Sequence, residues 1–362
     1  MKMRIRGTIA ALAVAVALMG LLTACSQQQS GPSESQAVSL NETGSSLLYP
    51  LFNLWVPVYT QANPGVKITT QSTGSGTGIS QSIEGIVQIG ASDAYISDAQ
   101  MKQHPEMLNI PLAISMQMVN YNLPGLNGQH LKLSGPVLAG IYEGKIRTWD
   151  DAAIRKLNPG VHLPHHAIVP VHRSDGSGDT FIFTQYLAFS TPAWAKSLNY
   201  GTTVSWPAVP GGLGAVGNPG MITAAKDNPY SIAYIGSSYQ DAIQKAGLGI
   251  AMIENHDGNF VLPEASTAGA AAAVMVPKTP KDQRISLIFA PGHDSYPIIN
   301  YEYALVSSKQ PSADMAAALR KFFTWAISQD GGNAPHFMEA VHFVPLPDAV
   351  AKLSADQISE IQ

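Results

Sequence analysis

The chain alternates between short apolar runs of strand length and longer segments in which apolar residues recur every three or four positions. The runs at 66–70, 167–172 and 232–235 predict β-strands. Strands that alternate with helices along a chain pack as layers of sheet and helix. The pattern therefore predicts an α/β fold.

Three segments have the periodicity of amphipathic helices. The first places on one face Leu47, Leu51, Leu54, Trp55 and Val58, and Pro57 is expected to kink it. The second places on one face Ile79, Ile83 and Ile86. In the third, Ser312 is the predicted N-cap, Gly331 and Gly332 mark the predicted end, and the core face carries Met315, Leu319, Phe322 and Phe323.

The N-terminus has the features of an export signal. Lys2, Arg4 and Arg6 supply positive charge, and the apolar run at 9–22 is shorter than a comfortable bilayer span. The run ends in Leu-Thr-Ala-Cys, which resembles a bacterial lipobox, with Cys25 as the only cysteine of the chain. We therefore expect a signal peptide at 1–24, lipidation of Cys25 and a flexible tether at 25–37. An ordinary signal peptide with an incidental thiol, or an uncut membrane anchor, is the alternative.

Size and charge narrow the possible classes of protein. The roughly 340 residues after the predicted signal exceed what one hydrophobic core usually organises, so two domains are expected. Charged residues make up only 13% of the chain, and the formal net charge is −4. This composition is typical of a packed globular protein, and it provides neither a basic face for nucleic acid nor an acidic tail.

Three loops rich in glycine and serine each come directly before a helical pattern, at 44–47, 74–78 and 175–180. The first turn of a helix has unpaired N–H groups and the positive end of the helix dipole, so it binds an anion without a net positive charge. Glycine lets the backbone approach a ligand, and serine adds a hydroxyl donor. Each loop alone is better explained as an ordinary helix cap. The three together predict an anion site.

Arg173 and Asp93 add charged groups to this predicted site. Arg173 precedes the third loop and can make charge-assisted hydrogen bonds to a tetrahedral oxyanion, although a surface salt bridge is the simpler alternative. Asp93 follows a strand-like run, and a carboxylate suits an anion site only if the ligand carries a proton. Phosphate near neutral pH has a P–OH donor, whereas sulfate has none. Such a site discriminates by roughly 10⁴ to 10⁵ against a ligand that lacks the hydroxyl.

Four segments resemble the PstS family, the phosphate-binding proteins of Pst ABC transporters. They are TGSSLLYPLFNLW, STGSGTGISQSI, IGASDAY and HRSDGSGDTFIFTQYL, in the order and spacing of that family. The similarity extends from about residue 40 to the C-terminus. It implies a type II periplasmic-binding-protein fold, with domain I at 38–117 and 299–362 and domain II at 118–298. The chain is expected to cross between the domains near 116–121 and 296–301.

The resemblance also implies a function and a set of binding residues. The implied function is high-affinity capture of inorganic phosphate and its delivery to the membrane permease subunits of an ABC importer. The protein would act as a monomer, lipid-anchored at the outer face of the cytoplasmic membrane, with no cofactor and no metal. Domain I would bind phosphate through Ser45, Ser46, Leu47, Ser75 and Asp93. Domain II would bind it through Arg173, Ser177, Gly178 and Asp179, with Asp175 orienting the arginine.

Asp179 departs from the commoner family pattern, in which a threonine follows the loop Asp-Gly-Ser-Gly. A hydroxyl donor has become a carboxylate, so the site has two acceptors, which are best matched by phosphate carrying two protons. We therefore hypothesise a preference for monobasic phosphate. The alternatives are that Asp179 faces solvent or caps its own helix.

Other chemistries are weaker matches to the sequence. His162, His165, His166 and His172 invite a metal site, but Pro164 interrupts the helix that would align the first and third of them. Ser177, His172 and Asp175 are the residue types of a catalytic triad, yet residues so close in sequence seldom reach triad geometry. Binding of another tetrahedral oxyanion, such as sulfate or molybdate, and a phosphate-handling surface enzyme remain the alternative functions. Binding without turnover is the interpretation that we favour.

Overall fold

The computed structural model describes residues 37–362. The predicted signal peptide, Cys25 and all but the last residue of the predicted tether lie outside the described residues. Within 37–362, no helix is long and apolar enough to cross a membrane.

Most strands belong to one nine-stranded mixed sheet, whose order is β2-β1-β3-β12-β4-β8-β6-β7, with β9 also paired to β4. A second, three-stranded sheet has the order β11-β10-β5. The strands are β1 (Val38–Gly44), β2 (Val66–Thr69), β3 (Ile89–Ser92), β4 (Met107–Asn122), β5 (Lys132–Leu133), β6 (Val169–Arg173), β7 (Leu213–Ala215), β8 (Ser231–Gly236), β9 (Gly249–Ile250), β10 (Met252–Glu254), β11 (Phe260–Val261) and β12 (Ile299–Ser307).

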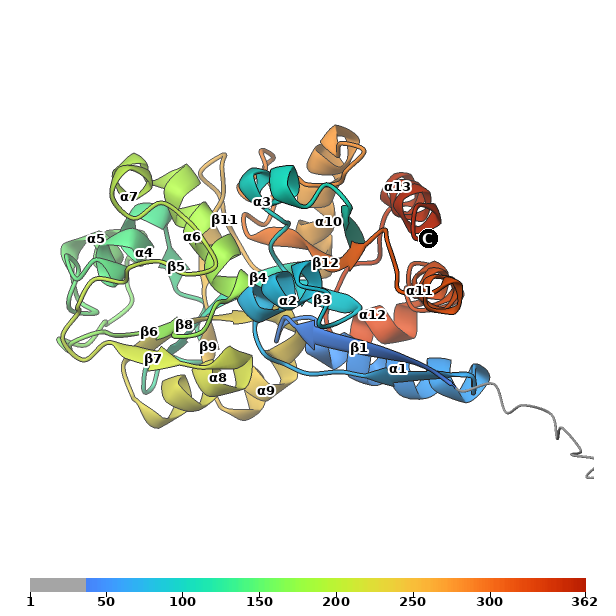
Figure 1. Ribbon diagram of the computed structural model, residues 1–362. Coiled ribbons are helices and arrows are strands. Elements are labelled where there is room, and N and C mark those ends of the chain that lie inside the picture. The colour runs from blue at the N-terminus through green and yellow to red at the C-terminus, as the bar shows by residue number, and fades with distance from the viewer. Residues whose placement is uncertain (1–36) are drawn as a thin grey trace, which may run out of the picture. The chain divides into compact units, whose positions relative to one another are not determined.

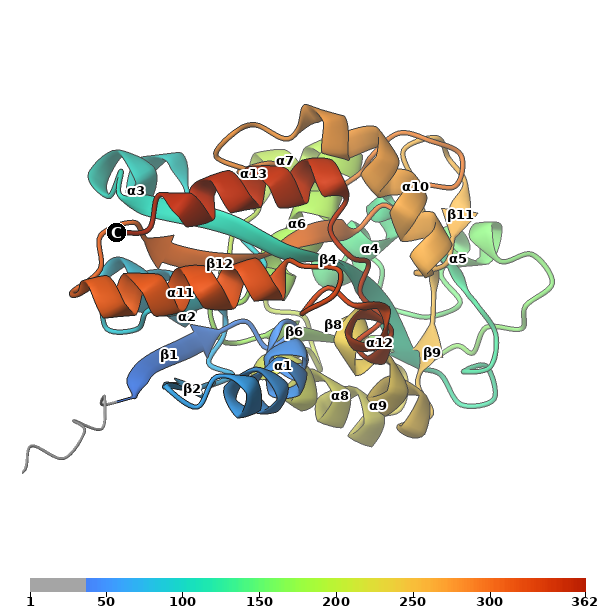
Figure 2. The same cartoon turned by 90° about the vertical axis from the view of Figure 1, so that its right-hand side faces the viewer.

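Helices cover both halves of the large sheet. They are α1 (Tyr49–Ala62), α2 (Ser75–Ile83), α3 (Asp98–Gln103), α4 (Gly135–Tyr142), α5 (Ala152–Leu157), α6 (Gly178–Ser190), α7 (Pro192–Ser197), α8 (Gly217–Asp227), α9 (Gln240–Lys245), α10 (Ala265–Met275), α11 (Ala313–Ala326), α12 (Pro335–Ala340) and α13 (Asp348–Ser359), with short 3-10 turns at Ser237–Tyr239 and Val276–Lys278. Helix α2 packs on β1, β3 and β12, whereas α6 and α8 pack on β8. Figure 2 shows α11 and α13 side by side in front of β12 and β4.

The long strand β4 connects the two halves of the sheet. Its first part pairs antiparallel with β12 up to Met116, and its second part pairs antiparallel with β8 from Gln117 onward. Figure 1 shows β6 to β8 on one side of this strand and β1 on the other. The change of partner lies where the sequence predicts the first crossing. Residues Ala37–Gln362 nevertheless form one compact unit, so the division into two domains stays a prediction.

The predicted strands are confirmed as β2, β6 and β8, but the predicted core face of α1 is partly wrong. Leu54 is 36% exposed and Val58 is 49% exposed. The helix buries Leu51 and Trp55, as predicted, and it also buries Phe52 and Tyr59. The three aromatic residues of this set pack against α11, where the ring of Phe322 contacts each of them. Packing against α11 therefore determines which residues of α1 are buried. Pro57 lies inside α1, and its predicted kink stays a prediction.

The other two helix predictions also need correction at one end. Helix α2 stops at Ile83, so Ile86 lies beyond it and is 57% exposed. Helix α11 begins as predicted, because the hydroxyl of Ser312 accepts a hydrogen bond from the N–H of Met315 at 3.1 Å. It ends at Ala326, before the predicted glycines. Gly332 instead donates its N–H to the carbonyl of Trp325 at 2.8 Å, in the turn after the helix.

Candidate anion-binding site

The predicted glycine and serine loops meet where α1, α2 and α6 begin. The N–H of Gly76, in the first turn of α2, donates to the carbonyl of Gly176 in the loop before α6 at 2.9 Å. A Cβ atom on Gly74, whose φ is +90°, would lie 2.6 Å from that same carbonyl oxygen. A Cβ atom on Gly178 would collide with the side chains of Asp93 and Ser75. Glycine is therefore required for the two helix N-termini to approach each other, and their positive dipole ends face one small volume.

Asp93 lies directly after β3, as predicted, and is fully buried. Its Oδ1 accepts a hydrogen bond from the hydroxyl of Ser45, and its Oδ2 accepts one from the hydroxyl of Ser75 at 3.3 Å. Burial raises the pKa of Asp93, while interactions with Glu302 and Ser45 and the charge of Arg173 oppose that increase. The loop hydroxyls therefore hold a buried carboxyl group at the start of α2.

The hydroxyl of Ser45 also organises the first loop. It accepts the N–H groups of Leu47 and Leu48, each at 3.0 Å. The N–H of Leu47, a residue that the resemblance implies as a phosphate contact, is thus engaged inside the loop. Its role toward an anion stays a prediction.

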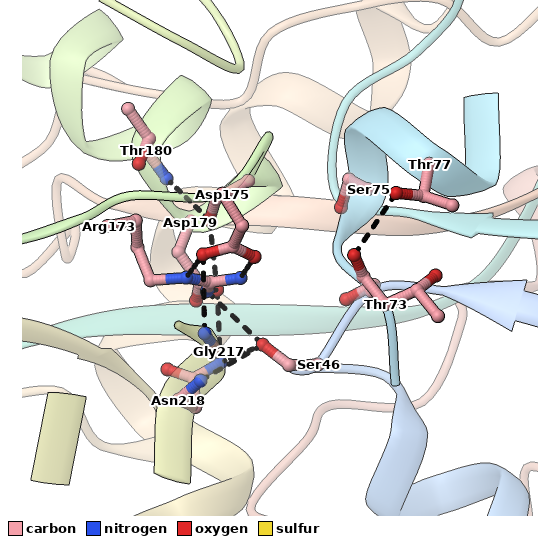
Figure 3. A network of polar contacts seen from close by, with 12 residues as sticks. Ser46, Thr73, Ser75, Thr77, Arg173, Asp175, Asp179, Thr180, Gly217 and Asn218 are labelled. Atoms are coloured by element: carbon pink, nitrogen blue, oxygen red, sulfur yellow. Dashed lines mark hydrogen bonds and ion pairs between the residues drawn. The ribbon is translucent and has the colours of Figure 1, made fainter. Parts of the chain in front are cut away.

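Arg173 ends β6 and lies between two aspartates, as Figure 3 shows. Its Nε donates to Oδ1 of Asp175 at 2.7 Å, and its Nη2 donates to Oδ2 of the same residue. Its Nη1 donates to Oδ2 of Asp179 at 2.5 Å and to the hydroxyl of Ser46 at 3.2 Å. The arginine is only 3% exposed, so the surface salt bridge considered as an alternative is wrong. Asp175 makes the contact with the guanidinium that its predicted orienting role requires.

Asp179 is buried in the first turn of α6, so the suggestion that it faces solvent is wrong. It does not cap the helix either, because the hydroxyl of Ser177 accepts the N–H of Thr180 at 3.2 Å. Oδ2 of Asp179 accepts from Arg173 and from Nδ2 of Asn218 at 3.0 Å. Oδ1 has no hydrogen-bond partner within 37–362. The site therefore contains a second buried carboxyl oxygen with free acceptor capacity.

Burial raises the pKa of Asp179 to about 7. The charge of Arg173 lowers this pKa, while the charges of Asp93 and Asp175 raise it. The carboxyl group therefore changes protonation near neutral pH, in contrast to an ordinary aspartate.

Asn218 is a residue of the site that the sequence analysis missed. Its N–H and its Nδ2 both donate to the hydroxyl of Ser46, at 3.2 and 3.0 Å, and the N–H of Gly217 donates to Asp175 at 3.3 Å. Both residues belong to the first turn of α8. The available signal was a fourth glycine-rich segment, at 211–217, directly before a helix. It resembles the three loops from which the anion site is predicted.

Glu302 is the second missed residue. It lies in the middle of β12 and is fully buried, and the hydroxyl of Ser115 donates to its Oε1 at 2.6 Å. The signal was a single charged residue in the otherwise uncharged run 296–307. Carboxylates are almost never fully buried without a partner, so such a residue needs an explanation.

The histidines lie in other surroundings. Nδ1 of His172 contacts the carbonyl of Arg173 at 3.0 Å, and its ring stacks on Trp206. The ring of His166 stacks on Tyr230. Residues 37–362 contain no group of three or more His, Cys, Asp or Glu that could hold a metal ion. The hydroxyl of Ser177 contacts Thr180 and Asp179.

Comparison with known proteins gives consistent matches over almost the whole chain. The family model of the PBP superfamily domain matches residues 30–330. The phosphate-binding protein PstS of Methanocaldococcus jannaschii is 33% identical over 96% of this chain and 92% of its own length. The phosphate-binding protein PstS of Pasteurella multocida is 35% identical over 91% of this chain and 92% of its own length.

A solved structure shows the same fold. A high affinity periplasmic phosphate-binding protein, PfluDING, with phosphate bound, superposes with a TM-score of 0.69 at 21% identity, over 87% of this chain and 92% of that one. This likeness concerns the fold, and it confirms the predicted periplasmic-binding-protein architecture. The family itself follows from the longer sequence matches: the chain belongs to the PstS family within the PBP superfamily.

Proposed function

We propose that this protein binds inorganic phosphate outside the cytoplasmic membrane and delivers it to an ABC importer. Membership of the PstS family supports this function, because the relatives at 33% and 35% identity are named phosphate-binding proteins. The observation that carries the proposal is the chemistry of the site. Two buried carboxyl groups, Asp93 and Asp179, lie beside one arginine where helices begin.

This combination selects for an oxyanion that also carries protons. The helix N-termini and Arg173 attract negative charge, whereas the carboxylates accept only from a ligand with O–H groups. Phosphate meets both requirements near neutral pH. Sulfate and molybdate are fully ionised there, so the two acceptors would repel them.

The roles of the individual residues are part of the proposal. The first half of the site contributes the loop Ser45 to Leu47, together with Ser75 as donor and Asp93 as acceptor of a phosphate proton. The second half contributes Arg173, Ser177 and Gly178 as donors, with Asp175 holding the guanidinium in place. In its ionised form, Asp179 supplies a second acceptor through its free Oδ1. With two acceptors, the preferred ligand is monobasic phosphate.

The protein is proposed to bind phosphate without chemical turnover. A nucleophilic enzyme of the triad type requires a base that is hydrogen-bonded to the serine. Ser177 instead uses its hydroxyl as a helix cap, and His172 stacks on Trp206. These contacts favour a receptor over a phosphate-handling enzyme.

Delivery to the importer would use the movement of two domains, 38–117 with 299–362 and 118–298. A ligand that contacts both domains stabilises the closed form, which the permease subunits then recognise. We propose that the protein acts as a monomer held at the outer face of the cytoplasmic membrane by a lipid on Cys25.

Isothermal titration of the purified full chain in detergent tests this function. The ligands are phosphate, arsenate and sulfate, each at one pH below and one above the second ionisation of phosphate. We expect heat from phosphate and arsenate, none from sulfate, and weaker phosphate binding at the higher pH. Binding of sulfate, or no binding of any ligand, would contradict the function, whereas equal affinity at both pH values would contradict only the monobasic preference.

Asp93→Asn is the matched variant, because the amide keeps the size of the carboxylate but replaces an acceptor by a donor. It is expected to weaken phosphate binding by roughly 10²-fold or more and to reduce the discrimination against sulfate. Asp356→Asn, at an exposed position of α13, is the control. A variant at Asp93 that still rejects sulfate as strongly as the native protein would remove this residue from the specificity mechanism.

A further inference from the structure

We propose that Glu302 is a positioning residue that holds a proton behind Asp93 and donates it in a hydrogen bond to that carboxylate. The bond leaves Asp93 with one negative charge and an acceptor free for the proton of the ligand. This inference rests on the proposed function, because it assigns the source of the selectivity of the same site.

The strand register places the two carboxyl groups side by side. Strand β12 pairs antiparallel with β3, with Tyr303 opposite Ser92 and Ala304 opposite Ala91. Continuing this register by one residue places Glu302 opposite Asp93. Directly opposed residues of antiparallel strands project to the same face, with Cβ atoms about 5 Å apart. Nδ2 of Asn300, on β12, also donates to the carbonyl of Asp93. This hydrogen bond holds the backbone of Asp93 against β12.

The hydrogen bonds of Glu302 are those of a neutral carboxyl group. Oε1 accepts from the hydroxyl of Ser115 at 2.6 Å. Oε2 is buried and has no hydrogen-bond partner within 37–362. An ionised carboxylate is acceptor-only, so two buried oxygens with a single donor would leave much of the charge uncompensated. A protonated Oε2 becomes a donor, and its neighbour Asp93 is an acceptor.

Within 37–362, the elements that pack most extensively against β12 bring no positive charge to Glu302. Strand β4 and helices α2 and α10, which pack against β12, contain no Lys, Arg, His, Asp or Glu. The charged groups that act on Glu302 are Asp93 after β3 and Asp179 on α6, and both are acidic. The cation of the site, Arg173, is already bonded to Asp175 and Asp179.

Burial raises the pKa of Glu302 well above its ordinary value, and the negative charges of Asp93 and Asp179 raise it further. The interaction between the two side chains lowers the pKa of Asp93 and raises that of Glu302. Two buried carboxyl groups in contact share one proton, because both cannot ionise in a medium of low polarity. The direction of these effects places the shared proton on Glu302 and the charge on Asp93.

This arrangement decides whether the site accepts an anion. With both groups ionised, the ligand would meet two adjacent negative charges. With both protonated, Asp93 would become a donor and lose its ability to recognise a P–OH group. One proton held on Glu302 avoids both states.

Phosphate titration of the full-length native chain and of Glu302→Gln and Glu302→Ala tests the inference. The amide of glutamine reproduces a neutral carboxyl group, since it accepts from Ser115 and donates to Asp93. Glu302→Gln is therefore expected to keep its phosphate affinity within about threefold of native, and to keep the rejection of sulfate. Glu302→Ala removes the donor and is expected to lose roughly tenfold or more, with weaker rejection of sulfate. Glu42→Gln is the control, because Glu42 is a buried carboxyl group on β1 whose pKa burial also raises, and it pairs with Ile89 and not with the end of β3 next to Asp93.

Difference infrared spectra of native and Glu302→Gln protein supply a readout that a merely structural role would not move. The native protein should show a C=O stretch of a protonated carboxyl group near neutral pH that the variant lacks, whether or not ligand is present. Loss of that band in the variant supports the proposal. Absence of the band in the native protein overturns it, even where the alanine variant fails to fold.

The binding outcomes separate this inference from the proposed function. A glutamine variant as weak as the alanine variant would mean that charge is required at this position, and an alanine variant with native affinity and selectivity would mean that Glu302 has no role. Either result overturns the inference while native phosphate binding stands. Failure of the native protein to bind phosphate would overturn both.

Discussion

The two sides of the candidate site balance their charge in different ways. On the side of β3 and β12, the strand register sets Asp93 opposite Glu302, and β4, α2 and α10 contain no cation. On the side of β6 and α6, Arg173 is held between Asp175 and Asp179. The first side is balanced by a proton and the second by a guanidinium. The two sides should therefore respond differently to mutation and to pH.

A guanidinium stays charged at all accessible pH values, so the positive charge of the second side is constant until Arg173 is removed. A shared proton depends on the solution pH and on the ligand. Asp179 belongs structurally to the arginine side, yet burial gives its pKa a value of about 7. Asp179 therefore tests most directly whether the two sides of the site differ in their response to pH.

The largest effect is expected for Arg173→Ala. Removing the guanidinium leaves Asp175 and Asp179 buried or half-buried without their cation, which should lower the free energy of unfolding by about 3 to 5 kcal/mol. Phosphate affinity should fall by roughly 10³-fold or more, since a charge-assisted donor is lost. Chemical denaturation and titration calorimetry measure the two effects.

Arg155→Ala, at an exposed position of α5, is the matched control and should change neither quantity appreciably. A loss of stability below about 1 kcal/mol at Arg173 would mean that this side of the site is not balanced by the arginine.

A smaller, pH-dependent effect is expected for Asp179→Asn. The pKa of Asp179 is raised from 3.8 to about 7 in the folded protein, so protonation favours the folded state. Its contribution to stability is present below pH 4 and is lost as the pH rises through 7. Between pH 4 and pH 8, the native protein should therefore lose about 2 to 4 kcal/mol more stability than the variant, as measured by denaturant titration across pH.

The same measurement on Asp356→Asn should follow the native curve. Parallel curves of stability against pH for the native protein and Asp179→Asn would mean that Arg173 keeps Asp179 ionised over this range. The charge of the arginine side would then not change with pH.

The smallest effect is expected for Ser46→Ala. The hydroxyl of Ser46 comes from the loop before α1 and accepts hydrogen bonds from Arg173 and from Asn218. Its removal leaves buried donors without an acceptor, which should cost about 1 to 2 kcal/mol of stability and weaken phosphate binding about tenfold. Ser80→Ala, at an exposed position of α2, serves as the control in the same titrations. Native affinity in Ser46→Ala would mean that this loop does not support the arginine side.

The local features of the fold were predictable from the sequence. Strand β8 and the cap of α11 at Ser312 follow from short runs and from residues three positions apart. The buried stripe of α1 was not fully predictable, because Leu54 and Trp55 are adjacent apolar residues and the pattern placed both on the core face. The aromatic cluster with Phe322 decided between them, and that contact joins segments far apart in the sequence.

The candidate site was predictable to a similar degree. The loops, Asp93 and the pair of Arg173 with Asp175 carry local signals, namely glycine and serine before a helix and charge beside a predicted strand. Asn218 and Glu302 were missed, since their partners are distant. Ser46 and Asn218 are 172 positions apart, and Ser115 and Glu302 are 187 positions apart.

The sequence by itself determined where helices begin with free N–H groups and which residues there can donate, accept or carry charge, because capping and glycine conformation act within a few residues. Only the tertiary structure decided that Asp179 is buried, that its Oδ1 stays free and that Glu302 lies behind Asp93. Burial and the contact between carboxyl groups depend on strand pairing and packing between distant segments. These contacts, and not the residue types alone, set the protonation of the site.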